Sequence, residues 1–581
     1  MNCFVYFREQ ILNILHSLQV RNVLPQDVSF ENVAVEPPKN PEHGELATNA
    51  AMVLSKVCGM PPRKLAEILE EELKQLKFVT DVAIAGPGFI NITLSAEFWH
   101  ARLTDILKER TEYGVVDLGN GQPVNVEYVS VNPTGPMHAG HGRVAIVGDA
   151  MARLMQKVGY RVTKEYYVND GGGQAITLAK STYLRYLEAL GEDIGEIPQG
   201  LYPGDYLKAV GESLAQEYGE KWRGVAEDSW MPFFQEYSVN AMMDLIRKDL
   251  ELISIKHDVF SSENKLVNAG KVEEVVKLLD EKGYVYTGVL DVPKGVEVDD
   301  YDSTPQLLFK STAFGDDVDR VLQKSNGEWT YFAKDIAYHY DKYLRGFKTQ
   351  INIWGADHAG YIKRIISAVK AISDEEVTLT VKTCQMVNFM QNGEALKMSK
   401  RDGTFITLED VVKAVGPDVV RFVMLMRRND AMLDFDFEKV KEQSKDNPVF
   451  YVQYAHARIH SVFRQAEDVF SDISESDLET ADLSYLSSKD ELAMIRLLAG
   501  WPRLIEMAAN YHEPHRIGGY IYDVAAEFHS LWNKGKDDAT LRFVVQDKNH
   551  TLARLALLKS IAYVIASGLD LFGVAPLQEM R

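Results

Sequence analysis

The chain has 581 residues, 46% of them hydrophobic and 25% charged, which is the composition of a soluble globular protein with three or four domains. No uninterrupted run of 18 apolar residues occurs, and no basic segment followed by an apolar stretch opens the chain, so we expect neither a membrane span nor a signal peptide. Three scattered cysteines argue against a disulfide framework or a zinc site and suit the cytoplasm, while a formal net charge of −21, taken alone, argues against a nucleic-acid partner.

The N-terminal segment predicts a small α+β unit. Apolar residues recur with helical spacing over residues 7–18, and a second helical stretch over 51–74 is interrupted by a glycine and a Pro-Pro pair. Two apolar runs flank a Gly-Pro-Gly turn within residues 79–94, which predicts two strands. Glycine-rich turns at 114–121 mark a boundary, so we place an N-terminal α+β domain at residues 1–115.

A strand, a helix and a second strand follow in that order. Residues 123–129 are typical of a buried strand, a loop rich in proline and glycine comes next, residues 141–158 predict a helix, and residues 159–168 predict the second strand. This succession predicts a parallel α/β sheet.

The parallel-sheet domain is predicted to continue to residue 408. Residues of about 175–290 are mostly helical and acidic and resemble an insertion. Strand–helix alternation resumes around residues 330–337, 350–354 and 378–387. We therefore predict a Rossmann-like domain over residues 116–408.

The rest of the chain has a helical pattern. We predict a connecting helical segment at 409–446 and an all-α domain at 447–581, with amphipathic stretches at 449–462, 491–508 and 551–566. The predicted fold class is a multidomain α/β protein, with a Rossmann-like parallel-sheet catalytic domain between an α+β N-terminal domain and an all-α C-terminal domain.

A first short motif lies in residues 131–143, Val-Asn-Pro-Thr-Gly-Pro-Met-His-Ala-Gly-His-Gly-Arg, between the predicted strand and helix. Ligands of α/β sheets bind at the carboxyl ends of the strands, and a helix N-terminus favours anions. Gly140 allows close approach of a ligand, and the imidazoles of His138 and His141 can stabilise charge on a phosphorus under attack. The alternatives are two surface histidines in a turn, or a metal-binding pair.

A second short motif, Lys397-Met398-Ser399-Lys400, follows the apolar strand near residue 387. Two flexible ammonium groups can bind the β- and γ-phosphates of a nucleotide and neutralise a departing pyrophosphate. Ser399 can supply a hydroxyl hydrogen bond, and Met398 is expected to pack inward. The alternative is a solvated basic turn.

Together, in this order and roughly 260 residues apart, the two motifs resemble the ATP-handling signatures of class I aminoacyl-tRNA synthetases. Their surroundings resemble the bacterial arginyl-tRNA synthetases over nearly the whole chain. The resemblance implies an arginine–tRNA ligase that uses ATP with Mg²⁺, forms arginyl-adenylate, and transfers arginine to the 2′-hydroxyl of the terminal adenosine of tRNA(Arg). We expect a cytoplasmic monomer that binds L-arginine and tRNA(Arg), with no membrane association and no metal held by protein ligands.

The resemblance also implies an arginine-binding pocket. In the family a glutamate is followed five residues later by an asparagine, as Glu127 and Asn132 are here, and Ser130 lies between them. The family pattern Tyr-x-x-x-Asp, which contacts the arginine side chain, matches Tyr331 and Asp335, although Asp335 is also a candidate cap for a helix beginning at residue 336. The resemblance implies that Asn132 and His141 hold the amino and carboxylate end of the arginine substrate. It also implies that Gln174, in a segment that resembles the family's Asn-Asp-x-Gly-x-Gln pattern, faces the site.

Two other groups of residues match the family. Gly355, Asp357 and His358 resemble the element that holds the ATP ribose. Residues 447–459 resemble the opening of the anticodon-binding domain, where aromatic side chains can stack on unpaired bases. The candidate tRNA-binding residues are Tyr451, Tyr454, Trp532 and Met580. Aromatic residues at this spacing are also common in helix cores.

Three other readings remain possible from the sequence. The chain could be a synthetase for another amino acid, against which the set Glu127, Tyr331 and Asp335 argues. It could be a catalytically inactive relative that binds RNA, although both histidines and both lysines of the signatures are present. It could also be a nucleotidyltransferase that does not use tRNA, which the helical C-terminal domain disfavours. The N-terminal domain resembles the family's add-on domain, which implies contact with the tRNA elbow.

Overall fold

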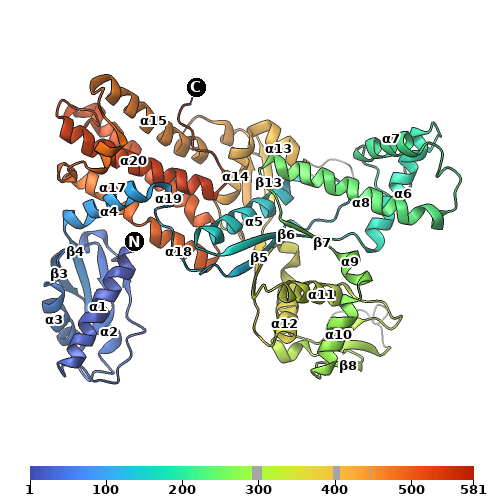
Figure 1. Ribbon diagram of the computed structural model, residues 1–581, viewed down its shortest axis with the longest axis horizontal. Helices are drawn as coiled ribbons and strands as arrows, with labels where there is room; N and C mark the ends of the chain where they lie inside the picture. Colours follow the sequence, from blue (N-terminus) through green and yellow to red (C-terminus); the bar gives the residue numbers. More distant parts are fainter. Residues whose placement is uncertain (291–303, 397–405, 445, 581) are drawn as a thin grey trace.

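The computed structural model describes residues 1–290, 304–396, 406–444 and 446–580. Figure 1 shows an N-terminal α+β unit, a central parallel sheet with flanking helices, and a C-terminal helical bundle, which confirms the predicted fold class. The second signature, residues 397–400, lies outside the described residues.

The N-terminal unit is a four-stranded antiparallel sheet, of order β1-β2-β4-β3, covered by helices. Helix α1 buries Phe7, Ile11, Leu15 and Leu18, which recur every three or four residues along one face. The predicted pair of strands at 79–94 is confirmed as β3 and β4, which pair antiparallel. The elements are α1 (Cys3–Val20), β1 (Val35–Glu36), β2 (Leu46–Thr48), α2 (Ala50–Leu54), α3 (Pro62–Leu73), β3 (Val79–Ala85), β4 (Phe89–Leu94) and α4 (Ala96–Glu109).

The central sheet has five parallel strands in the order β12-β11-β5-β6-β7. The predicted strand–helix–strand unit is confirmed as β5, α5 and β6. The interior strand β5 is buried along nearly its whole length, as expected for a parallel strand covered on both faces. The elements are β5 (Pro123–Tyr128), α5 (Ala139–Lys157), β6 (Arg161–Val168), β7 (Val259–Ser262), β11 (Thr349–Gly355), α12 (Ile362–Ser373) and β12 (Thr378–Cys384).

The segment predicted as a helical insertion is helical in most of its length, but it contains strands that the sequence did not predict. The short strand β7 adds to the edge of the central sheet, and β8 belongs to a separate antiparallel sheet of order β10-β9-β8. Four-residue strands carry too little periodicity to stand out within a helical pattern. The elements are α6 (Gly172–Ala189), α7 (Tyr206–Tyr218), α8 (Glu227–Leu252), α9 (Glu263–Asn268), α10 (Lys271–Glu281), β8 (Val285–Gly288), β9 (Gln306–Phe309) and β10 (Arg320–Gln323).

Residues 330–337, where we expected strand–helix alternation to resume, form the start of helix α11 (Tyr331–Leu344). Thr330 caps this helix by accepting a hydrogen bond from Ala333 N at 3.3 Å. The alternative role of Asp335 as a helix cap is therefore wrong, because Asp335 lies inside the helix, one turn after its start.

The C-terminal region is a helical bundle, as predicted. The connecting segment 409–446 is not wholly helical, because β15 (Leu433–Asp436) pairs in parallel with β13 (Val387–Gln391), which also pairs with β14 (Glu394–Ala395). The alternating apolar residues of β15 fit a half-buried strand. The helices are α13 (Leu408–Val415), α14 (Pro417–Leu425), α15 (Pro448–Val469), α16 (Glu475–Glu479), α17 (Lys489–Ala499), α18 (Trp501–Tyr511), α19 (His515–Asp537) and α20 (Lys548–Leu571).

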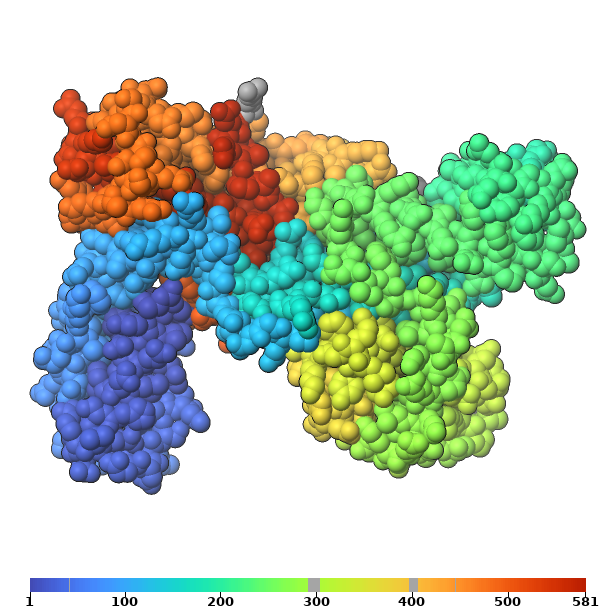
Figure 2. Space-filling view, viewed as in Figure 1, coloured from blue at the N-terminus to red at the C-terminus, as the bar shows by residue number. Residues whose placement is uncertain are grey.

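The regions pack closely in the middle of the molecule and project separately at its periphery (Figure 2). Helix α4 packs against α17 and α20, and Arg496 forms an ion pair with Glu45 at 3.1 Å. Helix α5 packs against α14 and α18. Within the described residues one helix, α20, is long and apolar enough to cross a membrane, but 78% of its most apolar window is buried, as in the core helix of a bundle.

Candidate functional site

The first signature forms the turn between β5 and α5, at the carboxyl edge of the parallel sheet. The two residues after β5, Val129 and Ser130, adopt left-handed conformations with φ of 72° and 41°. A β-branched residue rarely adopts that conformation, and such strain gathers at functional sites. The turn directs Ser130 Oγ back toward the sheet, where it accepts from Tyr167 N at 3.0 Å and donates to Glu127 Oε1 at 3.2 Å.

The two signature histidines lie together at the N-terminus of α5. His138 caps this helix, since its Nδ1 accepts from His141 N at 3.3 Å, and the two imidazole rings stack with centroids 3.3 Å apart. A Cβ at Gly140 would lie 3.1 Å from the His138 ring, so a larger residue would displace the ring. The positive end of the helix dipole makes this a position that favours an anion.

The loop that carries the histidines is held by two distant segments. Met137 N donates to the buried carboxylate of Asp249 at 2.8 Å, and burial raises the pKa of Asp249 to about 6. Ala139 N donates to Ile406 O, and Leu408 N donates to Met137 O, each at 2.9 Å. The residues that follow the second signature are thus hydrogen-bonded to the first.

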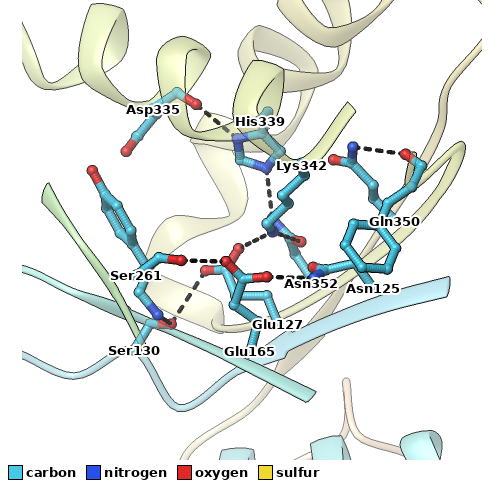
Figure 3. Close-up of polar contacts among 12 residues, drawn as sticks. Asn125, Glu127, Ser130, Glu165, Ser261, Asp335, His339, Lys342, Gln350 and Asn352 are labelled. Atoms are coloured by element: carbon cyan, nitrogen blue, oxygen red, sulfur yellow. Dashed lines mark hydrogen bonds and ion pairs between the residues drawn. The ribbon is translucent and has the colours of Figure 1, made fainter. Parts of the chain in front are cut away.

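Buried charged side chains lie beside the strained turn (Figure 3). Glu127 is 4% exposed, and its Oε2 accepts from Lys342 Nζ of α11 at 2.6 Å. Glu165 on β6 is likewise buried and is neutralised by Arg345 at 2.8 Å. Each carboxylate is compensated, as a charge removed from water must be. Glu127 is bonded to Ser130 and Lys342, whereas Glu165 accepts from Ser261 Oγ at 2.6 Å in addition to Arg345.

Asp335 is a second carboxylate of this region, and the charge of Glu127 acts on it. It lies partly buried on α11 and accepts from Tyr361 Oη at 2.7 Å. Burial is the main cause that raises the pKa of Asp335 to about 7; the hydrogen bond from Tyr361 opposes the rise, and the charges of Glu127 and Glu263 add to it. Glu263 is paired with Lys334 at 2.8 Å. Asp335 is therefore poised to gain from a cation placed beside it.

Three other residues predicted to bind arginine are exposed. Asn132 is exposed, and its Oδ1 accepts from Asn169 Nδ2 at 3.0 Å. Tyr331, at the start of α11, is 70% exposed. Gln174 is exposed in the first turn of α6. A Cβ at Gly172 would lie 3.6 Å from Tyr331 Oη, so the starts of α6 and α11 face each other across the site.

The predicted ribose-binding residues lie where β11 ends and a short 3₁₀ turn begins. Asp357 and His358 are exposed there, 3.5 Å apart. A Cβ at Gly355 would lie 2.3 Å from Asp357 Oδ1, so only glycine leaves that carboxylate in place. β11 is the neighbour of β5, which puts this turn and the histidine loop at the same edge of the sheet.

The candidate RNA-binding aromatic residues come together from two helices of the C-terminal bundle. The guanidinium of Arg458 lies 4.2 Å from the ring of Tyr454 and 4.8 Å from that of Trp532. The ring of Tyr451 lies 4.5 Å from that of His529. His529 is buried and the other four side chains are partly buried, so they form one aromatic and cationic cluster at the surface of α15 and α19. Met580 is partly buried near the end of the chain.

Sequence reasoning missed several residues of the pocket, among them Lys342, Glu263 and Tyr361. A signal for Lys342 was present, because Asp335, His339 and Lys342 stand at positions i, i+4 and i+7 of one helix and so share a face. No comparable pattern marks Glu263 or Tyr361, which reach the pocket through the packing of separate elements.

Family models cover almost the whole chain. The model described as "Arginyl tRNA synthetase N terminal domain" matches residues 6–94. The model described as "tRNA synthetases class I (R), catalytic domain" matches residues 102–462, and "DALR anticodon binding domain" matches residues 452–580.

Curated relatives match along their full length. The arginine–tRNA ligase of Parvibaculum lavamentivorans is 56% identical over 583 residues, and that of Ruegeria pomeroyi is 51% identical over 582, with 100% of each chain covered in both comparisons. Among solved structures, the arginyl-tRNA synthetase of Thermus thermophilus has a TM-score of 0.72 at 20% identity, covering 99% of this chain and 100% of that one. The enzyme of Plasmodium falciparum has a TM-score of 0.71 at 18% identity, covering 100% and 99%. These two structures agree in fold.

Proposed function

Because this chain belongs to the arginyl-tRNA synthetase family, we propose that Glu127 and Asp335 bind the guanidinium of arginine, and that the signature residues bind ATP. The observation that supports this assignment is the proximity of two carboxylates, the buried Glu127 and the partly buried Asp335, whose pKa is raised by burial and by the charges of Glu127 and Glu263. A planar guanidinium donates in a fork that suits carboxylates.

The chain is an arginine–tRNA ligase that uses ATP. Its substrates are arginine and tRNA, and the C-terminal anticodon-binding domain serves recognition of the tRNA. Full-length relatives of this one activity set aside the readings as a synthetase for another amino acid, an inactive RNA-binding relative or a nucleotidyltransferase.

In the first step the arginine carboxylate attacks the α-phosphorus of ATP, giving arginyl-adenylate and pyrophosphate. No protein nucleophile is needed, so the chain contributes positioning and charge stabilisation. We assign His138 and His141, at the positive end of α5, to the α-phosphate, and Lys397 and Lys400 to the departing pyrophosphate. Gly140, Met398 and Ser399 complete the phosphate site.

The remaining pocket residues are assigned by their placement. We assign Asn132 and His141 to the amino and carboxylate end of arginine, Tyr331 with Asp335 to its side chain, and Ser130 and Gln174 to the same site. Gly355, Asp357 and His358 bind the ribose. In the second step the 2′-hydroxyl of the terminal tRNA adenosine attacks the adenylate carbonyl and releases AMP.

We propose that ATP is used with Mg²⁺. The histidine loop offers two imidazoles at the positive end of α5, which suit phosphate oxygens. Within the described ranges no three His, Cys, Asp or Glu side chains are grouped as a metal site. Mg²⁺ would therefore be held mainly by the phosphates, where it supplies positive charge.

The pH dependence of arginine binding tests the pocket. Because the raised pKa of Asp335 is about 7, this carboxyl carries a proton below that pH, and the proton competes with the guanidinium. Affinity for arginine should fall by about tenfold for each pH unit below about 7, as linkage to one proton requires. Titration calorimetry with arginine between about pH 5.5 and about pH 8 measures this.

The matched control for this experiment is Asp335→Asn, which should bind arginine weakly and with little pH dependence. The stability of the protein without arginine should depend on pH in the opposite direction to the affinity for arginine. The folded protein keeps a proton that the unfolded chain loses near the ordinary value of 3.8, so the contribution of Asp335 to stability is lost as the pH rises toward about 7. A flat pH profile in the wild-type protein would contradict the assignment of Asp335.

We also propose that Tyr451, Tyr454, Trp532 and Met580 contact the tRNA. Trp532→Ala should raise the KM for tRNA by on the order of 10-fold, since it removes one stacking surface. The KM values for arginine and ATP should not change, because the cluster lies on a separate domain. Tyr511→Ala is the control, as Tyr511 is 57% exposed on α18 of the same bundle. An unchanged KM for tRNA together with a lower Tm would assign Trp532 to the core instead.

The domain limits proposed from the sequence, 1–115, 116–408, 409–446 and 447–581, remain our division of the chain, with the N-terminal domain at the tRNA elbow. We propose that the enzyme acts as a monomer in the cytoplasm, without a membrane, as befits a soluble enzyme of translation.

A further inference from the structure

A continuous chain of hydrogen bonds runs beneath the proposed guanidinium pocket and joins its two carboxylate residues (Figure 3). The carbonyl oxygen of Asp335 lies 2.8 Å from His339 Nδ1, and His339 Nε2 lies 2.9 Å from Asn352 Nδ2. Lys342 Nζ donates to Asn352 Oδ1 at 3.3 Å and to Glu127 Oε2 at 2.6 Å. Four of these five side chains are at most 5% exposed, and the fifth, Asp335, is partly buried.

The chemistry of its members fixes the direction of this chain. A lysine ammonium only donates, so Asn352 must turn its oxygen to Lys342 and its NH₂ group to His339. The Nε2 atom of His339 must then accept, which places the ring proton on Nδ1, where it is donated to the carbonyl of Asp335. Burial, together with the charge of Lys342, lowers the pKa of His339 to about 3, so the ring is neutral as the chain requires.

This chain of hydrogen bonds connects one helix to two strands. Asp335, His339 and Lys342 lie on one face of α11, Asn352 lies on β11, and Glu127 on β5 is the register partner of Asn352. Lys342 also lies 4.3 Å from the centroid of the Tyr338 ring, so its ammonium group is enclosed on a third side. A shift of α11 along the sheet would break several of these bonds at once, and the separation of Glu127 and Asp335 is therefore fixed.

Two of the three carboxylates around the proposed pocket already have a lysine partner, and the third does not. Lys342 compensates Glu127, and Lys334 compensates Glu263. Asp335, whose partner is the neutral hydroxyl of Tyr361, has no cationic partner of its own among the ion pairs of the described residues. Apolar side chains in place of these hydrogen-bonded residues often give a protein of equal stability. Stability alone does not explain why these groups are polar.

We propose that His339, Asn352 and Lys342 are positioning residues, which hold Glu127 and Asp335 at the spacing that one guanidinium spans and set the pocket charge for a single monocation. This inference rests on the proposed function of Glu127 and Asp335. The three residues act on the substrate through those carboxylates, so they should govern binding of arginine and leave ATP binding alone.

Asn352→Leu tests the proposal in the full-length enzyme. Leucine has the same branched skeleton as asparagine, with two larger methyl groups in place of the amide oxygen and NH₂. It can neither accept from Lys342 nor donate to His339, so the hydrogen-bond chain is cut at its centre. We expect the KM for arginine to rise on the order of 10- to 100-fold, the scale of lost buried hydrogen bonds, with kcat and the KM for ATP changed less than about twofold. Steady-state aminoacylation gives all three values.

Asn125→Leu is the matched control. Asn125 lies on β5 two residues before Glu127, is fully buried, and donates to Glu165 Oε2 at 2.6 Å, outside the chain under test. The same substitution there should lower the Tm to a similar degree and leave the KM for arginine unchanged. An equal rise in both variants, or no rise in Asn352→Leu, would overturn the proposal and make the chain purely structural.

Two further variants separate the possible failures. If Asn352→Leu does not fold, His339→Leu and His339→Asn replace it. His339→Leu should raise the KM for arginine. His339→Asn should restore it in part, because the asparagine amide retains a donor to the Asp335 carbonyl. Glu127→Gln tests the proposed function itself. An unchanged arginine KM in Glu127→Gln would refute the pocket, whereas a raised value there with a normal value in Asn352→Leu would refute only the positioning role.

Discussion

Replacing His141 by alanine is expected to lower kcat for arginyl-adenylate formation by about 10²–10³-fold, the scale of removing one donor to a developing charge. His141 lies in the first turn of α5, with its ring stacked on His138. The imidazole is assigned to the α-phosphate, where negative charge grows only as the arginine carboxylate attacks. Its loss should therefore appear in kcat far more than in the KM for ATP.

His141 is a cleaner choice than His138. His138 also caps α5 through Nδ1, so His138→Ala would combine a catalytic loss with a loss of helix stability of about 1 kcal/mol. The measurement is ATP–pyrophosphate exchange with tRNA present, together with the Tm of each protein.

The variants His141→Asn and His141→Gln identify the nitrogen that acts, since their amide groups lie close to the positions of Nδ1 and Nε2 respectively. Recovered activity in His141→Asn would assign the hydrogen bond to Nδ1, and recovered activity in His141→Gln would assign it to Nε2. Wild-type turnover in folded His141→Ala would show that this histidine does not stabilise the transition state.

The second large effect is expected at Asp335. Asp335→Asn should raise the KM for arginine on the order of 10²-fold or more, the scale of losing one charged partner from a buried pair, with the KM for ATP nearly unchanged. The hydrogen bond from Tyr361 at 2.7 Å can be kept by an asparagine oxygen, so the fold should persist. The loss then reports the charge and not the shape.

Asp341→Asn is the control for Asp335→Asn. Asp341 lies on the same helix, six residues later, and pairs with Arg345 at 2.9 Å away from the pocket. Its substitution should leave the KM for arginine as in the wild type. If Asp335→Asn raised the KM values for arginine and ATP together, the aspartate would be supporting the whole site and not selecting the amino acid.

The signature motifs could be predicted from the sequence because their chemistry is local. A loop with two histidines between a strand and a helix already implies an anion site, and the structure places both at the N-terminus of α5. The strand–helix–strand unit and the helical bundle were predicted from hydrophobic periodicity, which repeats over many residues. Short elements such as β7 and β15 were not, since four residues carry too little periodicity to compete with a helical pattern.

The partners of the buried charged residues could not be predicted from the sequence. Glu127 could be assigned to a pocket by its place after a strand, but its partner Lys342 lies 215 residues away along the chain. Asp335 could be read as a helix cap until Thr330 was seen to hold that position. Glu263 and Tyr361 reach Asp335 from elements whose relative placement no local pattern records.

The sequence by itself determined the family and the two signatures, and it predicted the residues that bind ATP and arginine, because those depend on residue type and spacing within short segments. Only the tertiary structure decided which charges compensate one another, which tautomer His339 adopts, and how far apart Glu127 and Asp335 are held. The physical reason is that a buried charge must find its partner wherever the packing of helix on sheet brings one, and that packing is set by the whole chain.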